Sequence, residues 1–446
     1  MFGLFETGFQ FFYWGNLLMF LIGGALIYLG ISKKMEPLLL VPIGFAIIAV
    51  NLPLGGLMDY ELDITNTTEV AARVTSFELD ETAKLGEGDV ILKLDSGEIL
   101  APVPGRIKEV TVSPGQEVQP GETLAVMITS AQTKLPTRPV GLFSRIFQYG
   151  IMWKLIPCLI FLGLGALTDF GPMLANPKTL LLGAAAQFGV YFAFFTALLC
   201  GFDIKEACSV GIIGSASGPT VIYVSATMAP HLLGAVAIAA YSYMALVPII
   251  QPPIIKLLTS KKERAIYMKP QLREVSSTEK IIFPIVATIV SVLFIPMAAP
   301  LIAPMMVGNL LTTCGVTERL SKTAGNAFID ILTIFLTLAV GATMAAENFL
   351  QPKALIVFAL GIVAFATSTA GGLLMAKLIN VFAKEKINPM IGAAGVSAVP
   401  MTARVVQVMG QKENLRNYLL MHAMGPNVAG AIGATIAGGV FLGMIG

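Results

Sequence analysis

Two apolar stretches of the chain, 206–228 and 388–410, are interrupted by residues that break helices and carry polar groups. The first contains Ser217 and the second contains Ser397, each shortly before a proline. Proline lacks a backbone donor, so carbonyls and amides are freed where such stretches cross a membrane. Paired interruptions in the two halves of a chain are typical of the central ion or substrate site of a transporter. The alternative interpretation is close packing of helices through small residues.

Several polar side chains in or beside apolar stretches could bind ions or organic anions. Arg404 follows the second interruption, and its guanidinium fork suits a carboxylate or a ureido group, unless it is an interfacial arginine. Asp330 interrupts an apolar run. It could be a cation ligand, a proton carrier or an interfacial acid near a helix start. Tyr241 and Tyr243 could donate to a substrate or pass a proton, or lie in the core. Asn427, in a third Gly-Pro break, offers a neutral oxygen to a hard cation such as sodium.

Composition places these residues in a membrane protein. Of the 446 residues, 55% are hydrophobic and 13% are charged, whereas an ordinary soluble chain is about 25% charged. The 27 acidic and 29 basic residues leave a net charge of +2, which excludes a nucleic-acid partner. The chain has two histidines and four cysteines without a CxxC pair, so we expect no transition-metal site.

Apolar runs with the length of a membrane-spanning helix, about 20 residues, recur along the chain. They predict an all-α polytopic membrane protein with about ten or eleven membrane segments, two of them broken or re-entrant and related by an inverted repeat. The uninterrupted runs are 16–32, 37–57, 151–168, 178–201, 231–258, 281–312, 325–345, 353–379 and 417–445.

These runs divide the chain into membrane and extramembrane parts. We expect an N-terminal membrane hairpin, an extramembrane domain, a first core membrane half, a loop and a second core membrane half. The loop is rich in lysine and arginine, so the positive-inside rule places it in the cytoplasm. The predicted boundaries, in this order, are 1–60, 61–130, 131–258, 259–280 and 281–446.

The charged segment 61–130 contains an internal repeat. Residues 73–94 align with 106–127 without a gap, at an offset of 33 residues. Each copy alternates apolar and polar residues and then turns at glycine, which predicts a small inserted β barrel-sandwich. The pattern resembles the biotinyl/lipoyl carrier domain, but the hairpin that would hold the carrier lysine, 94–102, contains no lysine. The resemblance implies a docking module for a true carrier domain or, alternatively, a spacer, and in either case no biotin on this chain.

Long motifs in the membrane segments resemble the β subunit of sodium-pumping biotin-dependent decarboxylases, which act on oxaloacetate, glutaconyl-CoA, methylmalonyl-CoA or malonate. The motifs are 35–40 (MEPLLL), 167–172 (LTDFGP), 240–253, 388–407 and 422–430. The resemblance implies a multi-pass protein of the bacterial inner membrane that forms a homo-oligomer. Its partners would be a biotin carrier subunit, a carboxyltransferase α subunit and a small membrane-anchored accessory subunit. Carboxybiotin, attached to a partner and not to this chain, would be decarboxylated with uptake of a proton while Na+ is exported.

The same resemblance implies roles for individual residues. Arg404 and Tyr243 would be catalytic, and together with Asn388 they would contact carboxybiotin. Movement of one membrane half against the other would alternate access to the sodium site. The resemblance places Asn388, Gly392, Ser397 and Asn427 at the sodium site, and from the residues themselves we also expect Ser217 and Asp330 to bind sodium.

Ser217 departs from the family motif. The family typically reads Gly-Gly-Ala-Asp-Gly-Pro-Thr, whereas residues 214–220 here read Gly-Ser-Ala-Ser-Gly-Pro-Thr. A hydroxyl can bind sodium but carries no negative charge. Three interpretations are open: impaired coupling, which would leave an assembly subunit; a changed ion or stoichiometry; or compensation by another acid, for which we expect Asp330. A sodium-coupled secondary transporter without decarboxylase chemistry is a further alternative.

Overall fold

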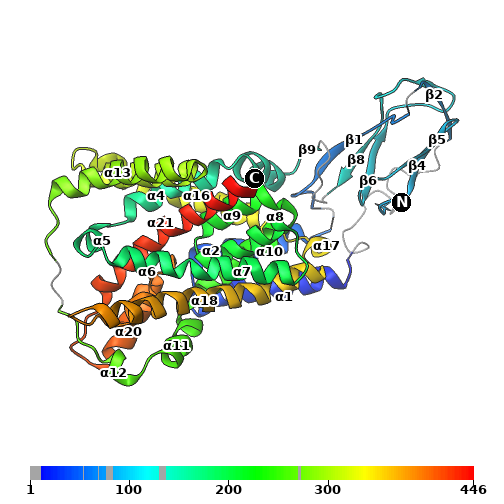
Figure 1. Cartoon of the computed structure of the whole chain (residues 1–446). Coiled ribbons are helices and arrows are strands. Elements are labelled where there is room, and N and C mark those ends of the chain that lie inside the picture. Colours follow the sequence, from blue (N-terminus) through cyan, green and yellow to red (C-terminus); the bar gives the residue numbers. More distant parts are fainter. Residues whose placement is uncertain are drawn as a thin grey trace.

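A computed structural model of the chain describes residues 12–53, 55–68, 70–76, 84–129, 137–269 and 273–445. It consists of a body of packed helices and a group of β-strands that projects from one end of this body (Figure 1). The mostly helical body agrees with the predicted fold class, and the strands lie in the segment where the sequence repeat predicts them.

The strands form two small antiparallel sheets that share one apolar core. One sheet has the strand order β3-β6-β8-β1-β9, and the other has the order β5-β4-β2-β7. Val74, Leu92, Ile107 and Met127 are buried between the sheets. The strands are β1 Tyr60–Thr65, β2 Ala72–Ser76, β3 Lys84–Leu85, β4 Val90–Leu94, β5 Gly97–Leu100, β6 Gly105–Val110, β7 Glu117–Val118, β8 Thr123–Thr129 and β9 Thr137–Pro139.

The internal repeat is visible in how these strands pair. In the first copy β2 pairs with β4, and in the second copy β6 pairs with β8. The short strands are exchanged, since β7 of the second copy pairs with β2 and β3 of the first copy pairs with β6. The exchange explains why the copies share one core and neither is a separate unit. Part of the first copy, 77–83, lies outside the described residues.

The helical body contains long apolar helices and several short ones. Three helices begin at reciprocal capping boxes, in which Asp203, Ser260 or Ser276 exchanges hydrogen bonds with the residue three positions later. The α-helices are α1 Trp14–Ser32, α2 Pro37–Val50, α3 Leu142–Ile146, α4 Leu155–Leu167, α5 Gly171–Ala175, α6 Thr179–Ala186, α7 Phe188–Leu199, α8 Ile204–Gly211, α9 Gly218–Met228, α10 Leu233–Ala245, α11 Val247–Leu258, α12 Lys261–Arg264, α13 Ser277–Phe294, α14 Ala299–Thr313, α15 Glu318–Thr323, α16 Ile329–Ala342, α17 Ala346–Phe349, α18 Pro352–Phe382, α19 Met390–Ala393, α20 Met401–Glu413 and α21 Leu420–Ile445. Short 3-10 or π-helical segments are η2 Phe147–Met152, η3 Ile212–Ser215, η4 Pro230–Leu232, η5 Pro296–Ala298 and η6 Ala324–Phe328.

Within the described residues, six helices are long and apolar enough to cross a membrane, or up to eight if each of two bent pairs is one span. The predicted number of ten or eleven segments is not confirmed. One expected span, 281–312, is wrong, because it consists of two helices, α13 and α14, that pack against each other. Pro296 and Pro300 begin new helical segments there, since proline is tolerated in a first turn but not inside a helix. The expected span 37–57 ends early, at Val50.

Each interrupted stretch forms a hairpin whose two ends lie together. In the first hairpin, α8 and α9, Glu206 Oε1 lies 2.9 Å from Nε2 of His231, which lies in η4 shortly after the end of α9. In the second, α19 and α20, Arg264 contacts both ends. Its carbonyl accepts from Nδ2 of Asn388 (2.8 Å), and its Nε donates to Oε1 of Glu413 (2.7 Å). Each stretch therefore enters and leaves the helical body at the same end.

The long helix α18 connects the ends at which the two hairpins open. At its start, Lys353 Nζ lies 2.8 Å from Oε1 of Glu206 at the base of the first hairpin. Near its other end, Lys377 Nζ lies 3.0 Å from Oε1 of Glu263, which directly precedes Arg264. The two hairpins consequently open toward opposite ends of the helical body.

The β-strands belong to the end of the body where the first hairpin opens. Asn51, which follows α2, donates through Nδ2 to the Met344 carbonyl (2.7 Å) and accepts from the Ala346 amide (2.9 Å). Both residues lie just before the start of α18. β1 is the next element after Asn51, and the sheets lie at the end of the body opposite α12, which contains Arg264 (Figure 1).

Candidate functional site

The first hairpin reverses at a short polar turn between α8 and α9. η3 continues the helix to Ser215, Ala216 has a left-handed backbone (φ 51°), and Ser217 precedes α9. The Ser217 hydroxyl lies 2.8 Å from the Thr220 hydroxyl, and its backbone amide donates to Ser215 Oγ over 3.3 Å. A left-handed alanine is strained, and only the surrounding packing keeps it in place. The turn therefore presents buried hydroxyl groups on a fixed backbone.

The second hairpin is unwound over residues 394–400, between α19 and α20. Asn427 of α21 binds this stretch: its Nδ2 lies 2.9 Å from the carbonyls of Ala394 and Val396 and 2.8 Å from the Thr402 hydroxyl. Asn427 is fully buried, and its Oδ1 has no hydrogen-bond partner in the described part of the chain. A buried acceptor without a partner costs about 1–3 kcal/mol. The second break thus contains an oxygen that is available to a ligand.

The two breaks are in direct contact. The backbone amide of Ser397 donates to the carbonyl of Ser215 over 3.2 Å, which joins the hairpins. Ser217 is two residues from this contact and is buried, as is Ser397. The structure therefore brings Ser217, Ser397 and Asn427 to the same junction. Unwound backbone carbonyls bind sodium in discontinuous-helix transporters, and the hydroxyl and amide oxygens here belong to the same class of hard oxygen ligands.

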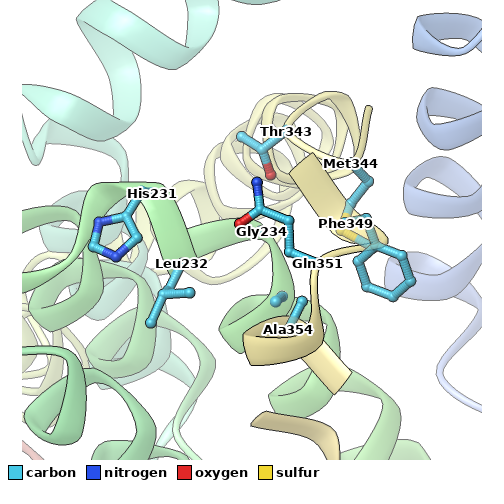
Figure 2. Close-up of a pocket in the computed structure, with 9 residues that line it drawn as sticks. His231, Leu232, Gly234, Thr343, Met344, Phe349, Gln351 and Ala354 are labelled. Carbon is cyan, nitrogen blue, oxygen red and sulfur yellow. The ribbon is translucent and has the colours of Figure 1, made fainter. Parts of the chain in front are cut away.

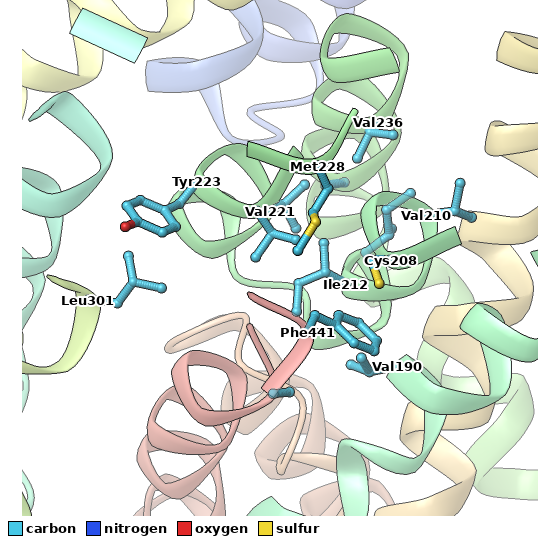
Figure 3. Close-up of a cluster of buried hydrophobic side chains, with 14 of the residues drawn as sticks. Val190, Cys208, Val210, Ile212, Val221, Tyr223, Met228, Val236, Leu301 and Phe441 are labelled. Atoms are coloured by element: carbon cyan, nitrogen blue, oxygen red, sulfur yellow. The ribbon is translucent and has the colours of Figure 1, made fainter. Parts of the chain in front are cut away.

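An apolar layer surrounds the first hairpin (Figure 3). Ile212 and Val221, on either side of the break, are fully buried. They belong to one cluster with Val190 of α7 and Phe441 of α21. This layer excludes water from one side of the junction, which strengthens the attraction between a cation and the oxygens there.

Gly392 and Asn388 have packing contacts in the structure. A methyl group on Gly392 would overlap the carbonyl oxygen of Gly372 in α18, so close approach of two helices requires glycine there. Nδ2 of Asn388 donates to the carbonyls of Arg264 (2.8 Å) and Ile266 (2.9 Å). These bonds tie the second hairpin to the loop after α12. Sodium or carboxybiotin binding by these two residues stays a prediction.

The two tyrosines of α10 have different surroundings. The Tyr243 hydroxyl donates to the Phe358 carbonyl in α18. The Tyr241 hydroxyl is buried and has no hydrogen-bond partner in the described residues. A Cβ added to Gly218 would lie 2.7 Å from this hydroxyl, so Tyr241 faces the first break. The sequence identifies both tyrosines, and the family resemblance selects Tyr243. Spacing along one helix does not tell which of the two side chains faces the break.

Arg404 and Asp330 are both exposed. Arg404 lies in the first turn of α20, and no hydrogen bond or ion pair joins its guanidinium to another described residue. Burial raises the pKa of the Glu36 carboxyl, in the turn between α1 and α2, and the charge of Arg404 opposes this rise. The guanidinium is therefore within electrostatic range of that turn. Asp330 lies in the first turn of α16 and is not among the buried residues of the junction.

A small cavity lies at the end of the body where the first hairpin opens (Figure 2). It has a volume of about 100 Å3. Residues of η4, α10 and the α16–α18 connection line it, and they include His231, Thr343 and Gln351. The cavity is therefore separate from the contact between Ser215 and Ser397.

An ionic cluster closes the base of the first hairpin, and we expect it to stabilise the fold. The buried Glu206 carboxylate accepts from Lys353 Nζ at 2.8 and 2.9 Å. Lys353→Met should lower the free energy of unfolding by about 2 kcal/mol, because it removes the cation from a buried acid. Glu206→Gln combined with Lys353→Met should cost less than the sum of the single changes. The midpoint of thermal unfolding in detergent measures each variant.

The exposed pair Glu318 and Lys322, one turn apart in α15, is the matched control. Its removal should cost less than about 0.5 kcal/mol, because water screens both charges. The stabilising interaction between Glu206 and Lys353 would be contradicted by equal losses of unfolding free energy at the two pairs. It would also be contradicted by strictly additive effects of the Glu206 and Lys353 changes.

Comparison with known proteins identifies the family. A family model described as "Na+-transporting oxaloacetate decarboxylase beta subunit" matches residues 15–445. The chain belongs to this family. The resemblance that the membrane motifs indicate is thereby confirmed, and the long apolar helices agree with a membrane subunit of such a decarboxylase.

Relatives of this β subunit are named for different decarboxylases. Methylmalonyl-CoA decarboxylase subunit beta of Propionigenium modestum is 48% identical over 99% of this chain and 98% of its own length. The probable oxaloacetate decarboxylase beta chain of Vibrio cholerae serotype O1 is 47% identical over 99% of this chain and 96% of its own. Glutaconyl-CoA decarboxylase subunit beta of Acidaminococcus fermentans is 45% identical, with coverage of 99% and 96%. The chain is thus about equally similar to relatives that are named for three different substrates.

Proposed function

We propose that the chain decarboxylates carboxybiotin, carried by a biotin carrier subunit, and couples this reaction to export of Na+ across the bacterial inner membrane. The contact between Ser215 and Ser397 carries the proposal. It joins two broken hairpins that open toward opposite ends of the helical body. An ion at such a junction can be reached from either side in turn, as alternating access requires.

The proposed chemistry needs a site for an anion and a site for a cation. In the anion site, the N–CO2− bond of carboxybiotin breaks, CO2 leaves, and the ring nitrogen takes up a proton. Arg404, whose guanidinium is unpaired in the described residues, would bind the carboxylate or the ureido group. Tyr243 and Asn388 would complete the contacts with carboxybiotin.

The cation site would lie at the junction of the two hairpins. Ser217, Ser397 and Asn427 would bind sodium there, with a backbone oxygen near Gly392. Asp330 would supply the negative charge that Ser217 lacks. Its exposed position means that it would act from a distance or after movement of α16.

The orientation follows from the charged loops. With the loop 259–280 in the cytoplasm, the sheets between α2 and α3 lie on the outer side. A domain there would act as a spacer and would not meet a carrier domain that moves in the cytoplasm. We propose that the two short hairpins, added to the six or eight long spans, complete the membrane domain. The partner subunits and a homo-oligomeric assembly are part of the same proposal.

Reconstitution of the complex in proteoliposomes tests this function. Carboxylated biotin carrier is added outside, and CO2 release and Na+ movement are measured with sodium or choline chloride present. The proposed pump releases CO2 faster with sodium and moves Na+ only while carboxybiotin is consumed. Sodium flux without CO2 release would instead support the secondary transporter. The absence of both sodium flux and CO2 release would support the assembly subunit.

A further inference from the structure

Five buried side-chain oxygens have no hydrogen-bond partner within the described residues: Gln187 Oε1, Ser225 Oγ, Tyr241 OH, Gln251 Oε1 and Asn427 Oδ1. Two of them belong to amides that bind neighbouring residues of the second break. Nε2 of Gln251, on α11, donates to the Ala393 carbonyl over 2.7 Å. Nδ2 of Asn427, on α21, lies 2.9 Å from the next carbonyl, that of Ala394.

The nitrogen contacts orient both amides. Because the Gln251 nitrogen is bonded to the last residue of α19 and the Asn427 nitrogen to the unwound backbone that follows, each oxygen has a set direction and does not turn to find another donor. Gln251 is fully buried, as Asn427 is. A buried amide oxygen that is left unpaired is unfavourable, and a cation or a water molecule would satisfy it. Two such oxygens beside one short stretch of backbone are best explained by a shared ligand.

The backbone around Gln251 offers further oxygens. The chain bends by 69° at Leu246, between α10 and α11, so these two helices are also a broken pair. Pro252 and Pro253 follow Gln251 and have no N–H. A regular helix would use those N–H groups to satisfy the carbonyls of Pro248 and Ile249, four positions earlier. Carbonyls freed in this way are ligands for alkali cations in broken membrane helices.

We infer that Gln251 is a sodium ligand, whose Oε1 binds the transported ion together with Oδ1 of Asn427. The inference rests on the proposed sodium site and extends it to the bent pair α10–α11, where the motif 240–253 contains Gln251 without singling it out. All of these ligands are neutral oxygens, as suits an ion that must be bound and then released. Since α11 belongs to the first half and α19 to the second, an ion held by both would couple the positions of the two halves.

Sodium-dependent thermal stability of the purified full-length chain tests this inference without decarboxylase activity. The unfolding midpoint is measured in detergent as NaCl replaces choline chloride at constant ionic strength. Gln251→Leu should raise the sodium concentration for half-maximal stabilisation about tenfold, because one ligand is lost. Gln251→Glu should keep this concentration at or below that of the parent chain, because the oxygen remains and gains charge, although the bond to Ala393 is lost.

Asn309 provides the matched control. It is a buried amide whose Nδ2 bonds the Thr168 carbonyl (2.7 Å) at the end of α4. Asn309→Leu should lower the unfolding midpoint and leave the half-maximal sodium concentration unchanged. If both Gln251 variants behave like Asn309→Leu, Gln251 is structural and the inference is overturned. If the parent chain shows no stabilisation by sodium, the proposed sodium site itself fails, and the inference with it.

Discussion

Replacing Ser217 with aspartate is expected to lower the sodium concentration for half-maximal CO2 release about tenfold. The change places a full negative charge at a buried junction whose other oxygens, from Ser397 and Asn427, are neutral. Ser217 also directly precedes α9, where the partial positive charge of a helix start stabilises a carboxylate. The cation site should therefore become stronger while its geometry is kept. Sodium titration of decarboxylation in the reconstituted complex measures the effect.

Ser217→Asn is the matched control, since asparagine has the size of aspartate and no charge. It should leave the sodium requirement close to that of the parent chain. Asp330→Asn tests the compensation hypothesis in both backgrounds. If Asp330 supplies the missing charge, its loss abolishes sodium stimulation in the parent chain but not in Ser217→Asp. An unchanged sodium requirement in Ser217→Asp would show that the transported ion does not bind beside residue 217.

Replacing Arg404 with alanine is expected to reduce CO2 release about a hundredfold or more, because the proposed carboxylate contact is lost. Arg404→Lys keeps the charge but loses the planar fork, and it should recover only a minor part of the activity. The sodium-dependent unfolding midpoint of both variants should match that of the parent chain, since Arg404 is exposed and outside the buried junction. CO2 release from carboxylated carrier and thermal stability in sodium separate the two effects.

Lys412, an exposed cation near the end of the same helix, is the control for a general loss of positive charge. Lys412→Ala should leave CO2 release unchanged. A full rate in Arg404→Ala, or an equal loss in Lys412→Ala, would remove Arg404 from the anion site. A sodium response that disappears with Arg404 would instead mean that the anion and cation sites are one.

Features with a local cause were predicted well from the sequence. The strands of the repeat follow from alternating residues and glycine turns, and the breaks at Ser217 and Ser397 follow from the prolines after them. The failures also have local causes. The run 281–312 is apolar throughout, so hydropathy joined two helices that Pro296 and Pro300 separate.

The arrangement of the site depends on contacts between residues far apart in the chain. Ser215 and Ser397 meet only because two hairpins enter from opposite ends of the body. Gly392 fits against Gly372, and Asn388 bonds a loop more than a hundred residues away. The family resemblance suggested ligands at these two positions, but glycine and asparagine also serve in close packing and in loop attachment.

Apolar content, broken segments and motifs are properties of neighbouring residues, so the sequence was sufficient for the membrane class, the family and the two breaks. The direction in which Tyr241 and Gln251 face, the exposure of Asp330, and the end of the body that carries the sheets needed the folded chain. These properties depend on which helices pack together. Burial of a polar atom is decided by residues that are close in space but far apart in the sequence.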